Sequence, residues 1–454
     1  MRNRSTRVLL IAGTIWVTAV IWFMLLSGWL GVRQGSVLLA RENVFFNSDT
    51  NTWIEAMVNN PDAAAGTRAV HPLAIALWRP PTQALFWLIR VVRPRDRAGP
   101  AAARLLIALV AGAGVGCLAW LALTIGVEMP QLLLLFAMYL LFTASSTIAL
   151  PEHFGLSNGL LSIAFVTPIL AAHRGVRATG LAVLAVVCGG TTITNALYPL
   201  GALYQWALEG RARRVAAVAA TIVLPIAVFL FVDSQLIVRP YIPGTAAPLG
   251  LAHRSILPAY VPAATRWYAK TSQIHGHVLG FANLRLLNHP MDAIVYAMFA
   301  LVAPAVGPPP AVRKTKGSDM VTYESSQPLR WTPVGSSGSD RPHLRDYLGV
   351  QSIGAVLWIS LLLYCVQYAF RHQMTRRLAW LPAGWILFNL VFHNLWGDEL
   401  FLYAPHWSWA LMALVILGAR GLSRMATALL VVPIAACQIG ALFQIKSALL
   451  TIYR

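Results

Sequence analysis

The sequence predicts an all-α protein that crosses a membrane many times. Of its 454 residues, 57% are hydrophobic and only 11% are charged, whereas soluble globular proteins carry about 25% charged residues. Apolar runs of about 20 residues recur along the chain, and a run of that length crosses a hydrocarbon core about 30 Å thick. Arginines lie between these runs and bring the net charge to +19. Together these observations exclude a soluble globular protein.

The apolar runs predict about eleven transmembrane helices. Nine are expected near residues 8–30, 101–125, 131–149, 155–172, 215–235, 349–370, 379–395, 405–419 and 425–445. The segment 178–209 is expected to form two further short helices around a polar turn at residues 191–195. The first run is longer than the apolar core of a cleavable signal peptide, so we expect it to remain as the first span.

The arginines predict how the chain is oriented in the membrane. Arg2, Arg4 and Arg7 precede the first span and favour a cytoplasmic N-terminus, because cytoplasmic loops are enriched in basic residues. The arginines that follow residues 172, 370 and 419 are also cytoplasmic only if the apolar segment 72–92 does not cross the membrane. Pro80 and Pro81 interrupt that segment, so it is expected to form interfacial helices on the outer side. The C-terminus is then outside.

This topology divides the chain into three parts. Residues 1–235 form an N-terminal transmembrane module whose first external loop covers residues 32–100. Residues 236–348 form a long external loop, within which the apolar stretch 291–306 is expected to lie on the membrane. Residues 349–454 form the C-terminal transmembrane helices.

Few ionisable residues remain outside the arginine clusters, and three groups of them stand at membrane edges on the predicted outer side. The groups are Asp49 with Arg68 and His71, then Glu152 with His153, and finally His393, Asp398 and Glu399 with His406. Ionisable groups near membrane depth are costly and often functional. Each alone is compatible with an interfacial residue satisfied by water or by a backbone carbonyl. Three groups on one side predict a shared pocket.

Other features have simpler interpretations. A basic chain often binds nucleic acid, but here the arginines lie between apolar spans, so we expect membrane lipids and no nucleic acid as partners.

The four cysteines, Cys117, Cys188, Cys365 and Cys437, lie in apolar runs and are expected to be buried free thiols. Trp396, Trp407 and Trp409 are expected to anchor the chain at the membrane interface. The sequence contains no Walker, HExxH or CxxC motif.

The order and sidedness of the polar groups resemble those of the GT-C superfamily of membrane glycosyltransferases. In that family one span precedes a large external loop with a catalytic acid, and interfacial helices precede the second span. The segments 47–49 and 72–92 match that pattern here. The external turn 150–155 resembles the family's second loop, and the segment 191–195 is similar to a short polar turn in bacterial members. The resemblance covers about the first 235 residues, and the Asp-x-Asp pattern of metal-dependent members is missing.

The resemblance implies transfer of a sugar from a polyprenyl-phosphate donor to a glycan, lipid or protein acceptor. The expected location is a plasma membrane such as the bacterial inner membrane, with the site facing the exterior or periplasm. Asp49 is the candidate general base and Glu152 the second catalytic candidate. The residues expected to hold the donor phosphate, the sugar or the acceptor are Arg68, His71, Arg79, Arg90, His153, His393, Asp398, Glu399 and His406. No cofactor or metal ligand set is implied.

Two other classes of protein fit the composition. A transporter or lipid flippase would use the same acids and histidines as a proton pathway, and predicts ionisable residues in mid-span and on both faces. A non-catalytic membrane subunit predicts that Asp49 and Glu152 do not converge.

Overall fold

A computed structural model describes residues 2–31, 50–60, 71, 73–174, 178–199, 201, 290–307, 311–312, 329–330, 350–395 and 403–452. These residues are almost entirely helical. Two strands of two residues each, β1 (Ala311–Val312) and β2 (Leu329–Arg330), pair in antiparallel register. The all-α fold class is therefore confirmed for the described part of the chain.

Among the described residues, four helices are long and apolar enough to cross a membrane. They are α1 (Arg2–Leu30), α5 (Arg95–Thr124), α15 (Val350–Arg371) and α19 (Arg424–Ile452). Three helices with shorter apolar stretches accompany them, namely α6 (Met129–Leu140), α8 (His153–Arg174, apolar over His153–Ile169) and α18 (Pro405–Ala419). The apolar helices support a membrane protein, but the predicted bundle of eleven spans is not confirmed within the described residues, and segment 215–235 lies outside them.

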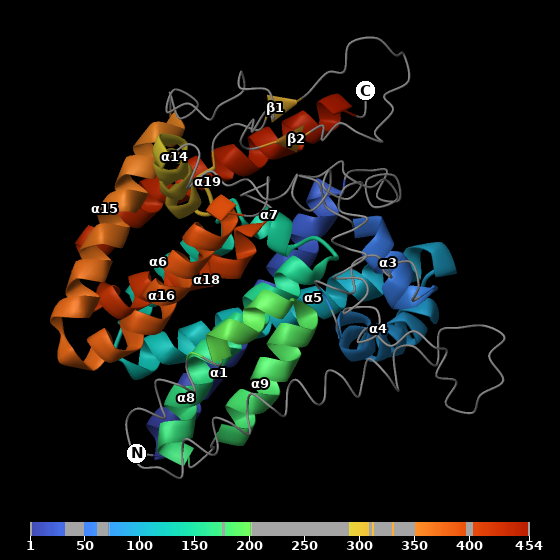
Figure 1. The fold of residues 1–454 in the computed structure, drawn as a ribbon, viewed down its shortest axis with the longest axis horizontal. Helices are drawn as coiled ribbons and strands as arrows, with labels where there is room; N and C mark the ends of the chain where they lie inside the picture. Colours follow the sequence, from blue (N-terminus) through green and yellow to red (C-terminus); the bar gives the residue numbers. More distant parts are fainter. Residues whose placement is uncertain are drawn as a thin grey trace.

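The remaining elements are shorter or more polar. They are α3 (Thr50–Val58), α4 (Ala74–Arg90), α7 (Ser145–Ile148), α9 (Ala178–Thr191), the 3-10 helix η2 (Ile193–Ala196), α14 (Pro290–Val302) and α16 (Gln373–Leu395). In Figure 1, α3 and α4 lie together at one side of the bundle, and α8 and α9 run side by side. The expected single helix 131–149 is instead α6 followed by α7, whereas α9 ends at the expected turn.

Helix α5 is the central element of the N-terminal part, because it packs against both α1 and α8 (Figure 1). Its contact with α8 depends on glycines. A Cβ atom on Gly159 would lie 2.2 Å from the carbonyl oxygen of Val110, and one on Gly114 would lie 2.7 Å from the Cα atom of Gly159. Small residues of this kind let membrane helices approach backbone to backbone.

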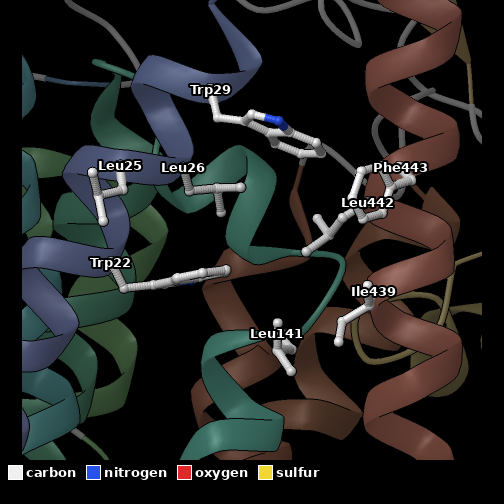
Figure 2. Close-up of a pocket in the computed structure, with 8 residues that line it drawn as sticks. All are labelled: Trp22, Leu25, Leu26, Trp29, Leu141, Ile439, Leu442 and Phe443. Atoms are coloured by element: carbon white, nitrogen blue, oxygen red, sulfur yellow. The ribbon is translucent and has the colours of Figure 1, made fainter.

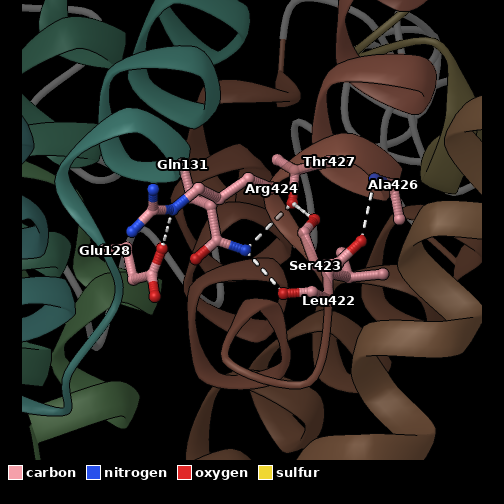
Figure 3. Close-up of polar contacts among 7 residues, drawn as sticks. All are labelled: Glu128, Gln131, Leu422, Ser423, Arg424, Ala426 and Thr427. Carbon is pink, nitrogen blue, oxygen red and sulfur yellow. Dashed lines mark hydrogen bonds and ion pairs between the residues drawn. The ribbon is translucent and has the colours of Figure 1, made fainter.

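At one end of α5, the loops after α5 and before α19 meet in a polar junction that Figure 3 shows. The guanidinium of Arg424 pairs with the carboxylate of Glu128. Gln131 donates to the carbonyl oxygen of Leu422 at 2.7 Å and to the hydroxyl of Thr427 at 3.1 Å. Both loops are predicted to be cytoplasmic, so their contact agrees with the topology.

The described parts of the loops predicted to be external lie at the other end. Leu106 of α5 lines a pocket together with Glu152, and Thr124, at the end of the same helix, lies four residues before Glu128. Eighteen residues of helix separate Leu106 from Thr124, which corresponds to about 27 Å. The two sets of loops therefore lie at opposite ends of the bundle, as the arginine pattern predicts.

The prolines of segment 72–92 do not break it into two helices as we expected, because α4 is continuous from Ala74 to Arg90. Arg79 donates to the carbonyl oxygen of Ala56 in α3 at 3.1 Å. The hydroxyl of Thr82 donates to the carbonyl oxygen of Trp78 at 2.6 Å. Phe86 is buried in a small core shared by α3, α4 and the start of α5. Packing against these neighbours outweighs the loss of the two proline N–H groups.

The stretch 291–306 also differs from expectation, because its C-terminal half is buried in the bundle and does not lie on the outside. The indole N–H of Trp358 donates to the carbonyl oxygen of Leu301 at 2.8 Å, and that of Trp407 donates to Ala300 at 2.9 Å. Trp407 and Trp409 are 1% and 0% exposed, so neither is an interfacial anchor; Trp396 lies outside the described residues. These indoles instead satisfy buried carbonyl groups.

The four cysteines are free, as predicted. Three of them are buried, and Cys117 is half-buried.

Candidate functional site

The candidate site is a buried polar cluster at the end of the bundle where the predicted external loops meet. His71 lies just before α4, His153 is the first residue of α8, and His406 is the second residue of α18. Their exposed fractions are 8%, 7% and 4%. Three segments far apart in the sequence thus supply one imidazole each, and we call these residues the histidine cluster.

The rings of the histidine cluster lie close together among aromatic side chains. The ring centroids of His71 and His153 are 3.9 Å apart, and those of His153 and His406 are 6.1 Å apart. Trp53 of α3 lies 5.4 Å from His71 and 5.3 Å from His153, measured between ring centroids. Phe154 covers the other side, 3.9 Å from His153 and 5.8 Å from His406. Water is therefore largely excluded from the imidazoles.

The hydrogen bonds of His71 determine which of its nitrogens is free to react. Its Nδ1 lies 2.8 Å from the carbonyl oxygen of Thr191. A carbonyl oxygen only accepts, so we infer that Nδ1 carries the proton and that Nε2 keeps its lone pair. Burial lowers the pKa of His71 from 6.5 to about 4, although the hydrogen bond to Thr191 acts in the opposite direction. His71 is therefore neutral near pH 7 and presents an unprotonated nitrogen.

His406 makes hydrogen bonds through both its ring and its backbone carbonyl group. Its Nδ1 lies 2.9 Å from Oδ1 of Asn195, in the 3-10 helix η2. Its carbonyl oxygen accepts hydrogen bonds from the indoles of Trp385 at 2.6 Å and Trp409 at 2.8 Å. The turn 191–195 thus contacts two of the three histidines, because Thr191 binds His71 and Asn195 binds His406.

Two polar atoms, one in the histidine cluster and one beside it, are left available for a ligand. Nδ1 of His153 and Nδ2 of Asn195 are buried and have no hydrogen-bond partner among the described residues. Buried polar atoms without a partner are uncommon in proteins, since each costs free energy. At a candidate site, such atoms favour recognition of a polar group that enters from outside.

Glu152 lies beside the histidine cluster at the tip of the turn before α8, and it is 2% exposed. It lines a narrow pocket with Trp53 of α3, Thr82 of α4 and Leu156 of α8. The volume of this pocket is about 10 Å³, which is room for about one water molecule. A sugar ring is larger, so a sugar enters here only if the elements around the pocket separate.

His393 belongs to the same end of the bundle but contacts the histidine cluster indirectly. Its ring stacks on Tyr403 with the centroids 4.6 Å apart. Tyr403 in turn lies 6.0 Å from Phe154, which covers His153. His393 therefore lies one layer of aromatic rings away.

The two described arginines of the predicted site lie elsewhere. Arg79 donates to backbone carbonyl groups of Ala56 and Asn59 in and after α3. Arg90 is exposed and lies 4.9 Å from the ring of Trp87. It is the last residue of α4, and the helix separates it from the His71 end by about 24 Å. The structure does not bring either side chain to the histidine cluster.

Four predicted site residues, Asp49, Arg68, Asp398 and Glu399, lie outside the described residues. Their roles stay predictions. In the sequence, Asp49 directly precedes Thr50, the first residue of α3, and this helix carries Trp53. The candidate base is thus four residues from an aromatic ring that contacts two histidines of the cluster.

Sequence reasoning missed Trp53 and did not assign a partner to the turn 191–195. The turn itself was predicted from its run of Thr and Asn residues between apolar halves, but its contacts with His71 and His406 were not. Trp53 carries no such signal, since a tryptophan in a short helix is most often part of the core. Across the described part of the chain, no group of three or more His, Cys, Asp or Glu side chains is arranged to hold a metal ion.

Comparisons with family models, with curated proteins and with solved structures find no match to this chain.

Proposed function

We propose that the protein is an integral-membrane glycosyltransferase that moves a sugar from a polyprenyl-phosphate donor to an acceptor on the extracytoplasmic side. The acceptor is a hydroxyl group of a glycan, a lipid or a protein. One observation carries the proposal, namely that His71, the turn of Glu152 and His153, and His406 converge at one end of the bundle. A non-catalytic subunit would not need this convergence.

The reaction assigned to this site is a substitution at the anomeric carbon of the sugar. The acceptor oxygen forms a bond to that carbon as the bond to the donor phosphate breaks. The acceptor proton passes to a base, and the polyprenyl phosphate leaves with the electron pair. Attack opposite the leaving phosphate inverts the configuration, so the site must supply a base on one side and hydrogen-bond donors on the other.

Asp49 remains our candidate for the base, on the basis of the sequence. His71 is the described group with the matching chemistry, because its Nε2 is unprotonated and its orientation is fixed by Thr191. Buried N–H groups can stabilise the departing phosphate, because fixed hydrogen-bond donors strongly stabilise the negative charge that develops in a site without water. Nδ2 of Asn195 and the imidazole of His153 are the described candidates for that role.

The distribution of ionisable residues favours an enzyme over a transporter or flippase. In α1, α5 and α19, the three longest described helices, the ionisable residue farthest from a helix end is Arg104, nine residues after the start of α5. A proton pathway across the membrane would require such groups in mid-span. The histidine cluster is instead confined to one end of the bundle, as expected for a site that meets a lipid-linked substrate at the interface.

The proposal is tested with the full chain purified in detergent and a panel of labelled polyprenyl-phosphate monosaccharides. We expect the wild type to release polyprenyl phosphate from at least one donor. Asp49→Asn and Glu152→Gln should each lower the rate by at least about 100-fold, in the range typical for general acid–base groups. A matched control is Glu128→Gln, at the opposite end of the bundle, which should retain wild-type turnover. Wild-type rates in Asp49→Asn would contradict the assignment of the base.

A further inference from the structure

An apolar groove lies between α1 and α19 (Figure 2), and none of its lining residues belongs to the histidine cluster. Its volume is about 280 Å³, close to the lower limit of about 300 Å³ for ligand pockets. Figure 2 shows side chains from both helices, and one from the turn after α6, pointing into the same space. The lining residues are Trp22, Leu25, Leu26, Trp29, Leu141, Ile439, Leu442 and Phe443.

The helix lengths place one end of this groove near a membrane surface. Twenty-two residues separate Arg7 from Trp29 in α1, and twenty-two also separate Arg424 from Lys446 in α19. At 1.5 Å per residue each stretch is about 33 Å long, which is close to the thickness of a hydrocarbon core. The two arginines thus mark one interface, and Trp29 and Lys446 mark the other. The groove descends from that second interface toward the bilayer centre.

A cation stands at the interfacial end of the groove. Nζ of Lys446 donates to the carbonyl oxygen of Trp29 and lies 5.6 Å from the centroid of the Trp29 ring. No carboxylate of the described residues pairs with Lys446. Its side chain is half-buried, so the apolar stem follows the helix surface and the ammonium group reaches the headgroup level.

The walls of the groove are apolar, and the indole N–H of Trp22 already has a hydrogen-bond acceptor. The indole N–H of Trp22 donates to the carbonyl oxygen of Leu140 at 2.7 Å. The Trp29 ring meets Phe443 edge to face, with centroids 5.4 Å apart. A hydrocarbon chain can therefore lie against these rings without burying an unpaired donor.

We propose that this groove binds an acyl chain of an anionic membrane phospholipid, with the lipid phosphate beside Lys446. The shape and the chemistry match this ligand, because an apolar cleft lies below the interface and a cation that pairs with no carboxylate of the described residues stands at its mouth. An anionic headgroup supplies the charge that the described residues do not provide. A symmetric contact with a second copy would bring two Lys446 ammonium groups toward the same interface, which like-charge repulsion disfavours. This site is independent of the proposed glycosyl transfer.

The test uses the full chain reconstituted in vesicles with two photoactivatable phospholipids of identical acyl chains. One lipid is phosphatidylglycerol and the other is phosphatidylcholine, each with a diazirine in the chain. We expect labelling of the segments 22–29 and 439–443, and about fivefold more labelling by the anionic lipid. Lys446→Gln should abolish that preference, whereas Arg95→Gln, which removes an exposed arginine at the same end of the bundle, should preserve it.

A second pair of variants tests the groove itself. Ile439→Trp fills the groove and should reduce labelling by both lipids at least fivefold. Val432→Trp is the matched control, because it makes the same kind of change on an exposed position of α19 seven residues earlier; it should retain wild-type labelling. Equal labelling by the two lipids in the wild type would overturn the proposal. A preference that persists in Lys446→Gln, or a crosslink between two copies of the chain through these segments, would do the same.

Discussion

The two ends of the bundle differ in how far their polar side chains are exposed. At one end, His71, His153 and His406 are buried among aromatic rings. At the other end, Arg424 and Glu128 form an ion pair whose side chains are 67% and 50% exposed. Helix α5 runs from one end to the other, from the pocket that Glu152 lines to the loop that contains Glu128. The contrast is therefore local and reflects what each end does.

The free-energy consequences of the two arrangements differ. An exposed ion pair contributes little to stability because water screens it and the side chains lose rotational freedom. A buried polar atom without a partner is destabilising. Two such atoms among the described residues lie at the histidine end, one in His153 and one in Asn195, which binds His406. A protein that retains this arrangement gains something other than stability from it. We infer that the gain is recognition of a polar substrate.

The largest expected effect is on activity and compares histidines at the two ends. His71→Gln removes the unprotonated Nε2 that Thr191 orients, and should lower donor turnover by at least about 100-fold. His372→Gln is the matched control, because His372 is exposed, follows α15 at the opposite end and contacts only Tyr368 among the described rings. Its turnover should equal that of the wild type. Equal losses in both variants would mean that the two ends do not differ functionally.

The next effect is on stability and concerns the helix contact that supports the histidine end. Gly159→Ala places a methyl group 2.2 Å from the carbonyl oxygen of Val110, so α5 and α8 must separate. We expect a loss of about 2–3 kcal/mol, the range for overpacking a close contact. Gly384→Ala is the control, because no atom lies within 4 Å of a Cβ atom built there; it should be neutral or stabilising by up to about 1 kcal/mol.

Thermal unfolding in detergent measures both glycine variants. A Gly159→Ala protein as stable as Gly384→Ala would show that α5 and α8 are not in close backbone contact.

The free energy of unfolding should depend on pH because His71 is buried in its neutral form. Its pKa is about 4 in the folded protein against 6.5 for the free side chain, so below pH 6.5 the unfolded state binds more protons than the folded state. Stability from this group is therefore complete above pH 6.5 and falls as the pH drops toward 4. The total loss is about 3 kcal/mol. Melting curves between pH 7.5 and 4.5 should show a shallower decline for His71→Gln, and parallel curves would contradict the burial of a neutral ring.

The smallest expected effect lies at the opposite end. Arg424→Gln removes the exposed ion pair with Glu128, and the hydrogen bonds of Gln131 to Leu422 and Thr427 still hold the junction together. We expect no measurable change in melting temperature at 0.15 M salt. Gln131→Leu is the sharper variant, since it removes both of those bonds and should lower the melting temperature. The reverse order of effects would show that the charges dominate at this junction.

The sequence predicts the chemistry of the histidine cluster better than its packing. The sidedness of His71, Glu152 and His406 follows from arginine placement alone, and the contacts among these residues agree with it. Their partners could not be predicted, because hydrogen bonds such as that between His406 and Asn195 join residues 211 positions apart. Hydropathy identifies apolar segments but not which face of each helix meets which neighbour.

In two segments, tertiary packing outweighs the structure that the local sequence predicts. Pro80 and Pro81 predict a broken helix, but α4 remains continuous because it packs against α3 and α5. The stretch 291–306 was assigned to the membrane surface by counting spans. Its end is buried instead, since Trp358 and Trp407 donate to its carbonyl groups. Both differences arise from tertiary contacts that no sequence window contains.

The most direct test of the proposed function is donor turnover by the purified wild-type chain in detergent, where no membrane gradient exists. An enzyme needs no gradient, whereas a transporter gives no signal in this assay. We predict release of polyprenyl phosphate with transfer of the labelled sugar to an acceptor, and loss of this activity in His71→Gln but not in His372→Gln. Intact donor across the whole panel with a folded wild-type protein, or turnover that survives in His71→Gln, would contradict the account.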